Sequence, residues 1–140
     1  MKTTLADIKA LIKTKLESID EIADTFDYPN GEFKEYPVAV ILDSGMTGIE
    51  IDSARNERTF HYIINLYQEQ TKAGKTSEEA SGVMERASDE IIEAFDKDPD
   101  LGEEVMRVSV VEASFDFKPT AGTFNFATFK IDVLAIVPNY

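Results

Sequence analysis

Three features of the sequence have residue types that could do chemistry: a single histidine, a Gly-Lys-Thr segment and a run of alternating aspartates. The histidine, His61, lies in a stretch from Arg58 to Glu69 whose alternation of side-chain types predicts a strand. Catalysis by His61 would need a nucleophile and an orienting group, and the sequence shows no elbow or triad signature. We therefore interpret His61 as a sheet residue whose ring is hydrogen-bonded within the fold.

The Gly-Lys-Thr segment, Ala73 to Ser77, lies between a predicted strand and a predicted helix, where a phosphate-binding loop would occur. That motif requires a glycine five residues before Gly74, and Glu69 occupies this position. Because the carboxylate of Glu69 would repel a phosphate group, the segment is not predicted to bind nucleotide.

The aspartate run, Asp96 to Asp100, has acidic residues at the first, third and fifth positions of a calcium-binding loop. Such a loop also requires glycine at its sixth position and glutamate at its twelfth, which are here Leu101 and Arg107. The sequence therefore predicts no metal, no cofactor and no enzymatic activity. Acid pairs of the kind that cleave glycosides stay open, because such carboxylates pair only in space.

The composition sets further bounds on the function. The chain has 140 residues, no cysteine and a net charge of −13. Its length fits a single domain over residues 1–140, and the lack of cysteine excludes thiol catalysis and thiolate metal sites. The acidic balance opposes nucleic-acid binding, which depends on cationic contacts to phosphate. No apolar stretch approaches the ~20 residues of a membrane span, so we expect a soluble, intracellular protein.

The elements that must position these residues follow from hydrophobic periodicity and capping signals. The expected elements are helix 4–18, edge strand 20–28, strand 38–42, strand 58–69, helix 76–98 and hairpin 105–137. This order predicts an α+β fold, a two-layer sandwich. We expect an antiparallel sheet of about four to five strands with two helices on one face and a long C-terminal β-hairpin.

The segment from Ser44 to Asn56 is rich in glycine and small polar residues, and we predict a long loop that includes at most a brief strand over residues 48–52. A loop of this length is uncommon without a function. We expect it to be mobile in the isolated chain and to become ordered on docking, with Met46, Ile49 and Ile51 supplying apolar contacts.

The hairpin from Val105 to Val137 has two alternating arms that flank residues 118–122. The expected antiparallel partners are Phe117 with Phe124, Phe115 with Phe126, Val110 with Ile131, Val108 with Val133 and Met106 with Ala135. In this register the apolar residues near the open end share one face, whereas the phenylalanines near the tip share the other. The apolar face therefore switches sides along the hairpin.

A sheet with one helical layer has a single core, so the switched aromatic tip needs an explanation. Either a β-bulge turns these rings toward the core, or they pack against another molecule, or the register is mispaired. The candidate residues for a subunit or tail-tube interface are Met46, Ile49, Ile51, Phe115, Phe117, Phe124 and Phe126.

Several parts of the chain, read together, carry a resemblance to a known family. They are Phe26-Asp27-Tyr28-Pro29, Glu35-Tyr36-Pro37-Val38-Ala39-Val40, Asn56-Glu57-Arg58-Thr59-Phe60 with Ile63-Ile64-Asn65-Leu66-Tyr67, and Ala94-Phe95-Asp96-Lys97-Asp98-Pro99-Asp100-Leu101-Gly102. With the first helix, they resemble the tail terminator and tail completion proteins of long-tailed bacteriophages, over nearly the whole chain. The resemblance implies no catalytic or cofactor residue.

What the resemblance implies is a structural virion assembly protein that forms a hexameric ring on the last ring of the tail tube and joins tail to head. The expected partners are further copies of the chain, the tail tube protein and a head-completion or neck protein, without a membrane. DNA would only pass through the lumen. The expected location is the virion tail, after assembly in the host cytoplasm. Six copies of a chain with charge −13 carry about −78, which would repel passing DNA.

Two other classes of function remain open. The chain could be a soluble acidic binding or inhibitory domain, such as a mimic of DNA, whose carboxylates imitate phosphates. It could also be a small enzyme whose acid pairs assemble in space. Ring formation separates the first alternative from a tail protein, and a pocket of converging carboxylates would favour the second.

Overall fold

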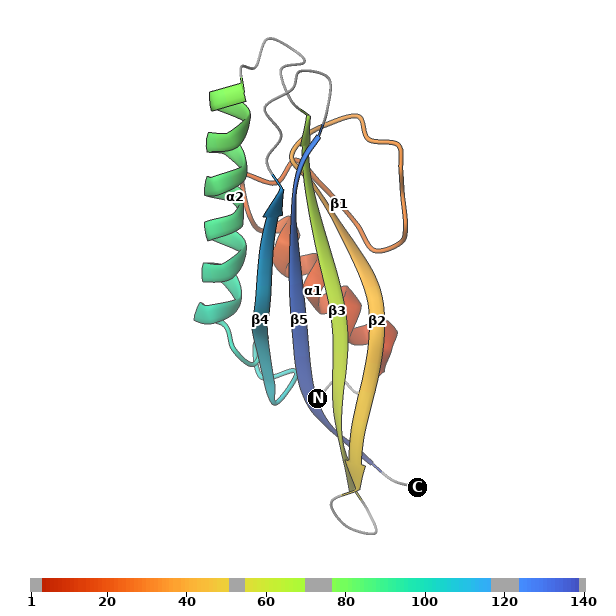
Figure 1. Cartoon of the computed structure of the whole chain (residues 1–140). Coiled ribbons are helices and arrows are strands. Elements are labelled where there is room, and N and C mark those ends of the chain that lie inside the picture. The colour runs from red at the N-terminus through yellow and green to blue at the C-terminus, as the bar shows by residue number, and fades with distance from the viewer. Residues whose placement is uncertain (1–3, 51–54, 70–76, 117–123, 139–140) are drawn as a thin grey trace.

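The computed structural model describes residues 4–50, 55–69, 77–116 and 124–138 of the chain (Figure 1). The elements are α1 (Leu5–Glu17), β1 (Asp24–Phe26), β2 (Val38–Glu50), β3 (Arg55–Glu69), α2 (Ser77–Lys97), β4 (Arg107–Asp116) and β5 (Phe124–Pro138). The strands form one sheet in the order β1-β2-β3-β5-β4. Figure 1 shows α1 behind this sheet and α2 alongside β4.

The predicted α+β fold with two helices and a C-terminal β-hairpin is confirmed. One detail differs, because β1 pairs with β2 in parallel and the sheet is mixed. Residues 27–37 do not form a tight hairpin turn between β1 and β2; they carry the chain back so that β2 runs in the same direction as β1. The other described strand pairs are antiparallel, as predicted.

The core lies between the two helices and one face of the sheet. On α1 the residues Ile8, Ile12 and Leu16 recur every four positions and are fully buried. The helix begins at Thr4, whose side chain accepts a hydrogen bond from the Asp7 N–H. The other fully buried members of the core include Ile41, Ile64, Leu66, Met84, Ala87, Ile91, Ala127, Phe129, Ile131 and Val133. Among the described residues, neither helix has the length and apolar composition that crossing a bilayer requires.

The loop predicted from Ser44 to Asn56 is wrong. β2 continues to Glu50 and β3 already begins at Arg55, so the described part of this segment belongs to two long paired strands. The glycines have structural roles within β2. Gly45 follows a β-bulge and has a φ of 144°, which L side chains rarely adopt. A glycine-rich composition therefore marks a bulged strand here.

The hairpin of β4 and β5 has the predicted register only near its open end, where Val108 faces Val133 and Val110 faces Ile131. A β-bulge between Val110 and Glu112 then shifts the pairing by one residue. Phe115 consequently lies opposite Ala127, and the predicted pairing with Phe126 is wrong.

The bulge separates the aromatic residues of the tip onto two faces. Phe115 shares the helix-covered face with Ala127 and Phe129, and its ring centroid lies 6.2 Å from that of Phe129 in a T-shaped arrangement. Phe124 and Phe126 alternate with the buried residues of β5 and stay on the opposite face. The bulge thus explains how Phe115 on β4 comes to face the helices. Phe124 and Phe126 on β5 stay on the other face, so other residues must cover them.

The sheet has unpaired edges on two opposite sides. β4 is the last strand on one side, and on the other β1 covers only Val38–Val40 of β2. Both exposed edge strands contain a bulge, at Ser44 in β2 and at Val111 in β4. Bulges in edge strands disfavour pairing with a strand of another chain. Contacts at these edges should therefore be made by side chains.

The chain after α2 is fixed to α1 by Asp98. Its carboxylate lies 2.8 Å from the Lys15 ammonium and accepts a hydrogen bond of 2.9 Å from the Gly102 N–H. The hydrogen bond from Lys15 and, to a smaller extent, the one from Gly102 lower the pKa of Asp98. This pair joins the ends of the two helices.

We expect Asp98→Asn to remove part of the acid sensitivity of folding. Because the pKa of Asp98 is lower in the folded chain, the pair stabilises the fold above the unfolded pKa of about 3.8. This stabilisation disappears as the pH falls through the folded pKa, and solvent exposure limits it to less than about 1 kcal/mol. Urea unfolding at pH 7 and pH 3 should show a smaller wild-type advantage at pH 3. If the wild type is more stable than Asp98→Asn by the same amount at both pH values, the pair of Asp98 with Lys15 is not the source of the acid sensitivity. Asp96→Asn, which removes a nearby carboxylate, is the matched control.

Candidate functional site

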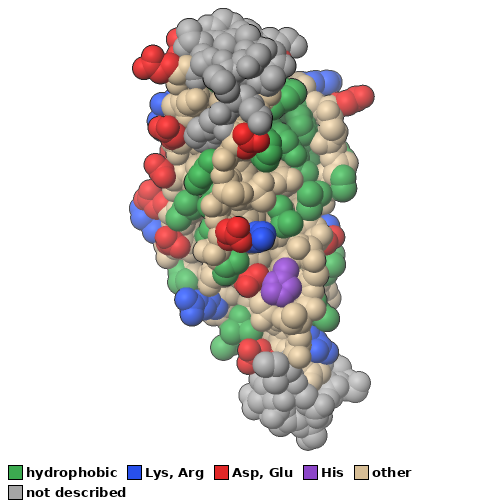
Figure 2. Space-filling view, in the orientation of Figure 1, with side chains coloured by type: hydrophobic (Ala, Val, Ile, Leu, Met, Phe, Trp, Pro, Cys, Tyr) green, Lys and Arg blue, Asp and Glu red, His purple; other side chains and the backbone are tan. Residues whose placement is uncertain are grey.

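The sheet face opposite the helices, called the open face, carries two groups of side chains. Figure 2 shows this face, with apolar side chains gathered over its upper part. The histidine and several charged side chains lie lower on the same face. We call the lower group the polar network (Thr47, His61, Glu112, Lys130 and Asp132) and treat the upper, aromatic group separately.

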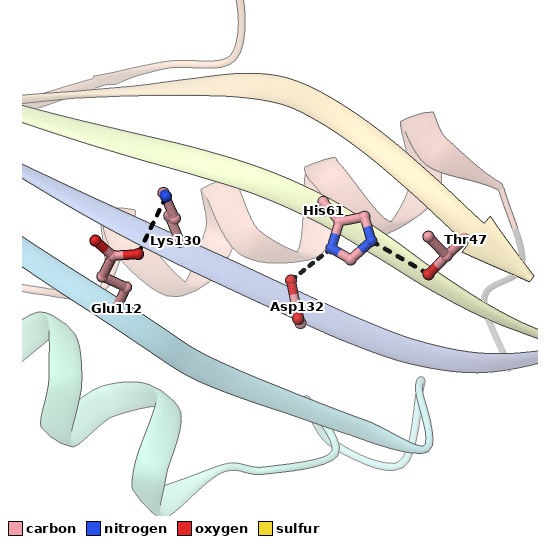
Figure 3. A network of polar contacts seen from close by, with 5 residues as sticks. All are labelled: Thr47, His61, Glu112, Lys130 and Asp132. Atoms are coloured by element: carbon pink, nitrogen blue, oxygen red, sulfur yellow. Dashed lines mark hydrogen bonds and ion pairs between the residues drawn. The ribbon is translucent and has the colours of Figure 1, made fainter.

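The polar network connects four strands (Figure 3). His61 on β3 lies opposite Asp132 on β5, and its Nδ1 is 2.6 Å from the Asp132 Oδ1. The other ring nitrogen, Nε2, is 3.3 Å from the Thr47 hydroxyl on β2. Beside them, the Lys130 ammonium lies 3.1 Å from the Glu112 carboxylate on β4. Residues 71 positions apart in the sequence are thus brought together by the pairing of β3 with β5.

The order of a hydroxyl, an imidazole and a carboxylate is also that of a catalytic triad. Acyl transfer further needs N–H donors that converge on the developing oxyanion. Strand N–H groups lie in the plane of the sheet and do not point toward a hydroxyl above it. Thr47 is an exposed residue on a flat strand face. The geometry therefore favours a network that fixes strand positions, in agreement with the interpretation of His61 as a hydrogen-bonded sheet residue.

Tyr62 is a second ionisable group close to the polar network, on the core face of β3. Its hydroxyl donates a 2.8 Å hydrogen bond to the Leu5 carbonyl. Burial and, to a smaller extent, the negative charge of Asp43 raise the pKa of the Tyr62 phenol. Tyr62 is therefore a neutral donor that holds the first turn of α1 against β3.

The upper group, called the aromatic cluster, consists of Phe26, Tyr28, Phe33, Tyr36, Tyr67, Phe124 and Phe126. Residues 27–37 cover this end of the open face, and the ring of Phe33 stacks on Tyr67 with centroids 5.4 Å apart. The ring centroids of Tyr36 and Phe124 are 5.8 Å apart. Val38 on the same face is fully buried. The chain's own connection between β1 and β2 thus partly covers the second arm of the hairpin tip.

The predicted interface residues lie in three different environments. Phe115 and Met46 are 53% and 51% exposed, on the helix-side face of β4 and β2. Phe124 is 42% exposed and Phe126 is half-buried within the aromatic cluster. Ile49 lies in β2, whereas Ile51 and Phe117 lie outside the described residues. The structure therefore does not join these residues into one surface.

The Gly-Lys-Thr segment and the aspartate run, which the sequence did not support as a phosphate-binding loop and a calcium loop, lie at the two ends of α2 in the sequence. The Gly-Lys-Thr segment lies outside the described residues up to Ser77, where α2 begins. In the aspartate run, Asp98 binds Lys15 and the Gly102 N–H. Among the residues that the structure describes, no group of three or more acidic or histidine side chains is placed to hold a metal ion.

A pocket of about 390 Å³ between α2 and the end of β4 was missed by the sequence reasoning. It is lined by Glu85, Ser88, Asp89 and Phe115. The spacing of Glu85 and Asp89 places both carboxylates on one side of α2, and this spacing was visible in the sequence. That Phe115 faces them was not, because the bulge in β4 decides it.

Comparison with known proteins gives no assignment: no protein-family model matches the chain, and no curated protein matches it. The resemblance to tail terminators thus depends on the segments quoted above. Two of them, residues 56–60 and 63–67, form the central part of β3. Another, residues 94–102, contains the end of α2 and Asp98.

Proposed function

We propose that this chain is a structural virion assembly protein of the tail terminator and tail completion class, which forms a ring at the end of the phage tail tube. The observation that carries the proposal is the placement of exposed apolar side chains on two opposite sides of the sheet. Met106, Val111 and Phe115 lie on or next to β4, and each is about half exposed. Met46 lies on β2, across the sheet from them.

Two different patches on opposite sides are what a head-to-tail ring requires. A head-to-tail contact joins one patch of a subunit to a different patch of the next, and the chain of contacts closes into a ring when the rotation permits. Where exposed apolar side chains gather into one patch, they commonly mark such contacts. Leu5, which is 38% exposed, lies on α1, which is joined to β2 through Lys9 and Asp43 at 3.1 Å.

The charge of the chain supports the same role. A ring of six copies would carry about −78, six times the −13 of one chain. An acidic conduit repels the phosphate backbone, so DNA passes through without binding. In this proposal the chain has no cofactor and no catalytic residue, and its partners are its own copies, the tail tube protein and a head-completion or neck protein. It resides in the virion tail after assembly in the host cytoplasm.

Electron microscopy of the purified chain mixed with tail tubes tests this role. The proposal expects rings bound at one end of each tube, because a terminator stops tube growth at a single end. Tubes whose two ends both stay bare, at concentrations where the chain is in excess, would contradict it. A chain that stays monomeric and instead binds a DNA-binding protein would support the alternative of an acidic inhibitory domain.

A further inference from the structure

The pocket between α2 and β4 has the groups that bind a positively charged side chain. Glu85 and Asp89 are exposed carboxylates one helical turn apart, and neither forms an ion pair with any residue in the described part of the chain. The Ser88 side chain is only 2% exposed, and its hydroxyl has no hydrogen-bond partner among the described residues. An unsatisfied buried hydroxyl that lines a pocket indicates a missing partner.

Phe115 completes this pocket with an apolar wall. Its ring is 53% exposed and is held from below by Phe129. A guanidinium group packs well on an aromatic face and donates up to five hydrogen bonds in one plane. Two carboxylates, one hydroxyl oxygen and one aromatic ring are therefore complementary to an arginine side chain.

An arginine with suitable placement has its guanidinium over β2, on the opposite side of the same sheet from β4. Arg58 on β3 faces Gly48 on β2, and its guanidinium occupies the space that a Cβ at residue 48 would need. Gly48 thus lets the Arg58 side chain extend across β2 toward the edge of β2 that β1 leaves uncovered. Among the described residues, Arg58 has no carboxylate partner.

Arg58 also lies next to the apolar patch on β2. Met46 pairs with Phe60, two residues after Arg58 on the same face of β3. The β2 edge therefore presents a cation beside an exposed methionine, and the β4 edge presents two carboxylates beside an exposed phenylalanine. Sulfur and aromatic rings make favourable contacts. The two edges are complementary in charge and in apolar character.

We propose that Arg58 of one copy binds in the pocket of Glu85, Ser88, Asp89 and Phe115 on the next copy, with Met46 packed beside Phe115. This inference rests on the proposed ring, and it names the contact that builds it. Each subunit contributes the Arg58 edge to one neighbour and the pocket to the other. The contact is head-to-tail, so it does not stop at a dimer, and it builds a ring when the rotation between copies closes.

The overall negative charge of the subunits does not prevent this contact. Each copy carries −13, but exposed charges are screened beyond about 8 Å at physiological ionic strength. A 140-residue domain has a radius of gyration of about 14 Å, so most charges of two neighbours lie farther apart than this screening length. The charges at the contact therefore decide whether copies attract, and an arginine between two carboxylates favours association.

A charge-reversal cycle tests the contact. Arg58→Glu and the double variant Glu85→Arg with Asp89→Arg should each weaken association about tenfold or more, which corresponds to removing one hydrogen-bonded charge pair. Mixing the two variants should restore association, because the pocket of one then meets the glutamate of the other. Sedimentation over a range of concentrations measures association, and thermal melting checks folding. Arg58→Gln removes the positive charge without placing a carboxylate over Gly48, and it should also weaken association; it keeps the test valid if Arg58→Glu disturbs the fold.

The outcomes separate this contact from the proposed ring. Lys13→Glu changes a charge on α1, outside the pocket between α2 and β4, and should leave association unchanged. If the wild type associates and the Arg58 and pocket variants associate equally well, the ring stands and this contact is wrong. If the mixed variants do not associate, a direct Arg58–pocket contact is likewise overturned. If the wild type never associates, the ring itself is wrong.

Discussion

Replacing Phe115 by serine should abolish assembly of the chain while the fold persists. The Phe115 ring is half exposed and forms the apolar wall of the α2–β4 pocket, so its removal exposes the contact to water. Truncation of a buried interface aromatic commonly weakens association by 2 kcal/mol or more. Within the subunit the Phe115 ring is about half buried and makes a T-shaped contact with Phe129, so its loss should lower the unfolding free energy by roughly 2 kcal/mol, less than the loss of a fully buried phenylalanine.

The matched control for this variant is Tyr28→Ser. Tyr28 is 54% exposed, close to the 53% of Phe115, but it lies in the aromatic cluster over the open face. Sedimentation and thermal melting of both variants separate assembly from folding. We expect Tyr28→Ser to assemble as the wild type does. A Phe115→Ser chain that still assembles, or that melts far below the wild type before any assembly defect appears, would remove Phe115 from the interface.

Replacing Phe129 by alanine should have the opposite profile, with a large loss of stability. Phe129 is fully buried in the core face of β5, between β3 and β4. Truncation of a buried phenylalanine typically costs about 3–5 kcal/mol, through lost burial and the cavity that remains. Because small domains have a total stability of about 5–15 kcal/mol, this variant should be close to unfolding.

Urea unfolding of Phe129→Ala against the wild type measures this effect. Phe129→Leu keeps most of the apolar volume and should lose much less stability than the alanine variant. If the unfolding free energy of Phe129→Ala is within about 1 kcal/mol of that of the wild type, the Phe129 side chain does not lie in a packed core. In that case the register of β5 against β3 and β4 would also have to be wrong.

The parts of the fold that the sequence predicts are those with local, periodic signals. The stripe of Ile8, Ile12 and Leu16 recurs at helical spacing and needs no knowledge of its partner to be recognised. The alternation from Arg58 to Glu69 likewise identifies most of β3. Signals of this kind depend on one segment only, so tertiary contacts do not change them.

The errors occur where a single residue changes the direction of a strand. Gly45 and Gly48 indicated a loop, but the first follows a bulge and the second makes room for Arg58. One extra residue, Val111, shifts β4 against β5 and moves Phe115 to the other face. Strand alternation has a period of two, so a shift of one residue reverses every side chain that follows. The switch of the apolar face along the hairpin indicated that a bulge was one explanation, but the sequence did not show which residue of β4 is the extra one.

The candidate sites combine residues that are distant in the chain. His61 meets Asp132 only because β3 pairs with β5, and the Phe115 pocket exists only because α2 lies beside β4. The sequence indicated Phe115 as an interface candidate through the switch of apolar face in the hairpin, and Met46 through its place in the expected loop from Ser44 to Asn56. The sequence did not indicate Arg58, because the direction of its side chain depends on Gly48, which lies across from it on β2.

The mass of the purified chain in solution tests ring formation most directly. One chain has a mass of 15.6 kDa, so a six-membered ring would have a mass of about 94 kDa. Native mass spectrometry over a wide range of protein concentrations should show this species, or another closed ring, with Phe115→Ser reduced to 15.6 kDa. A wild-type chain that stays at 15.6 kDa at every concentration, alone and with tail tubes, would contradict the proposed function.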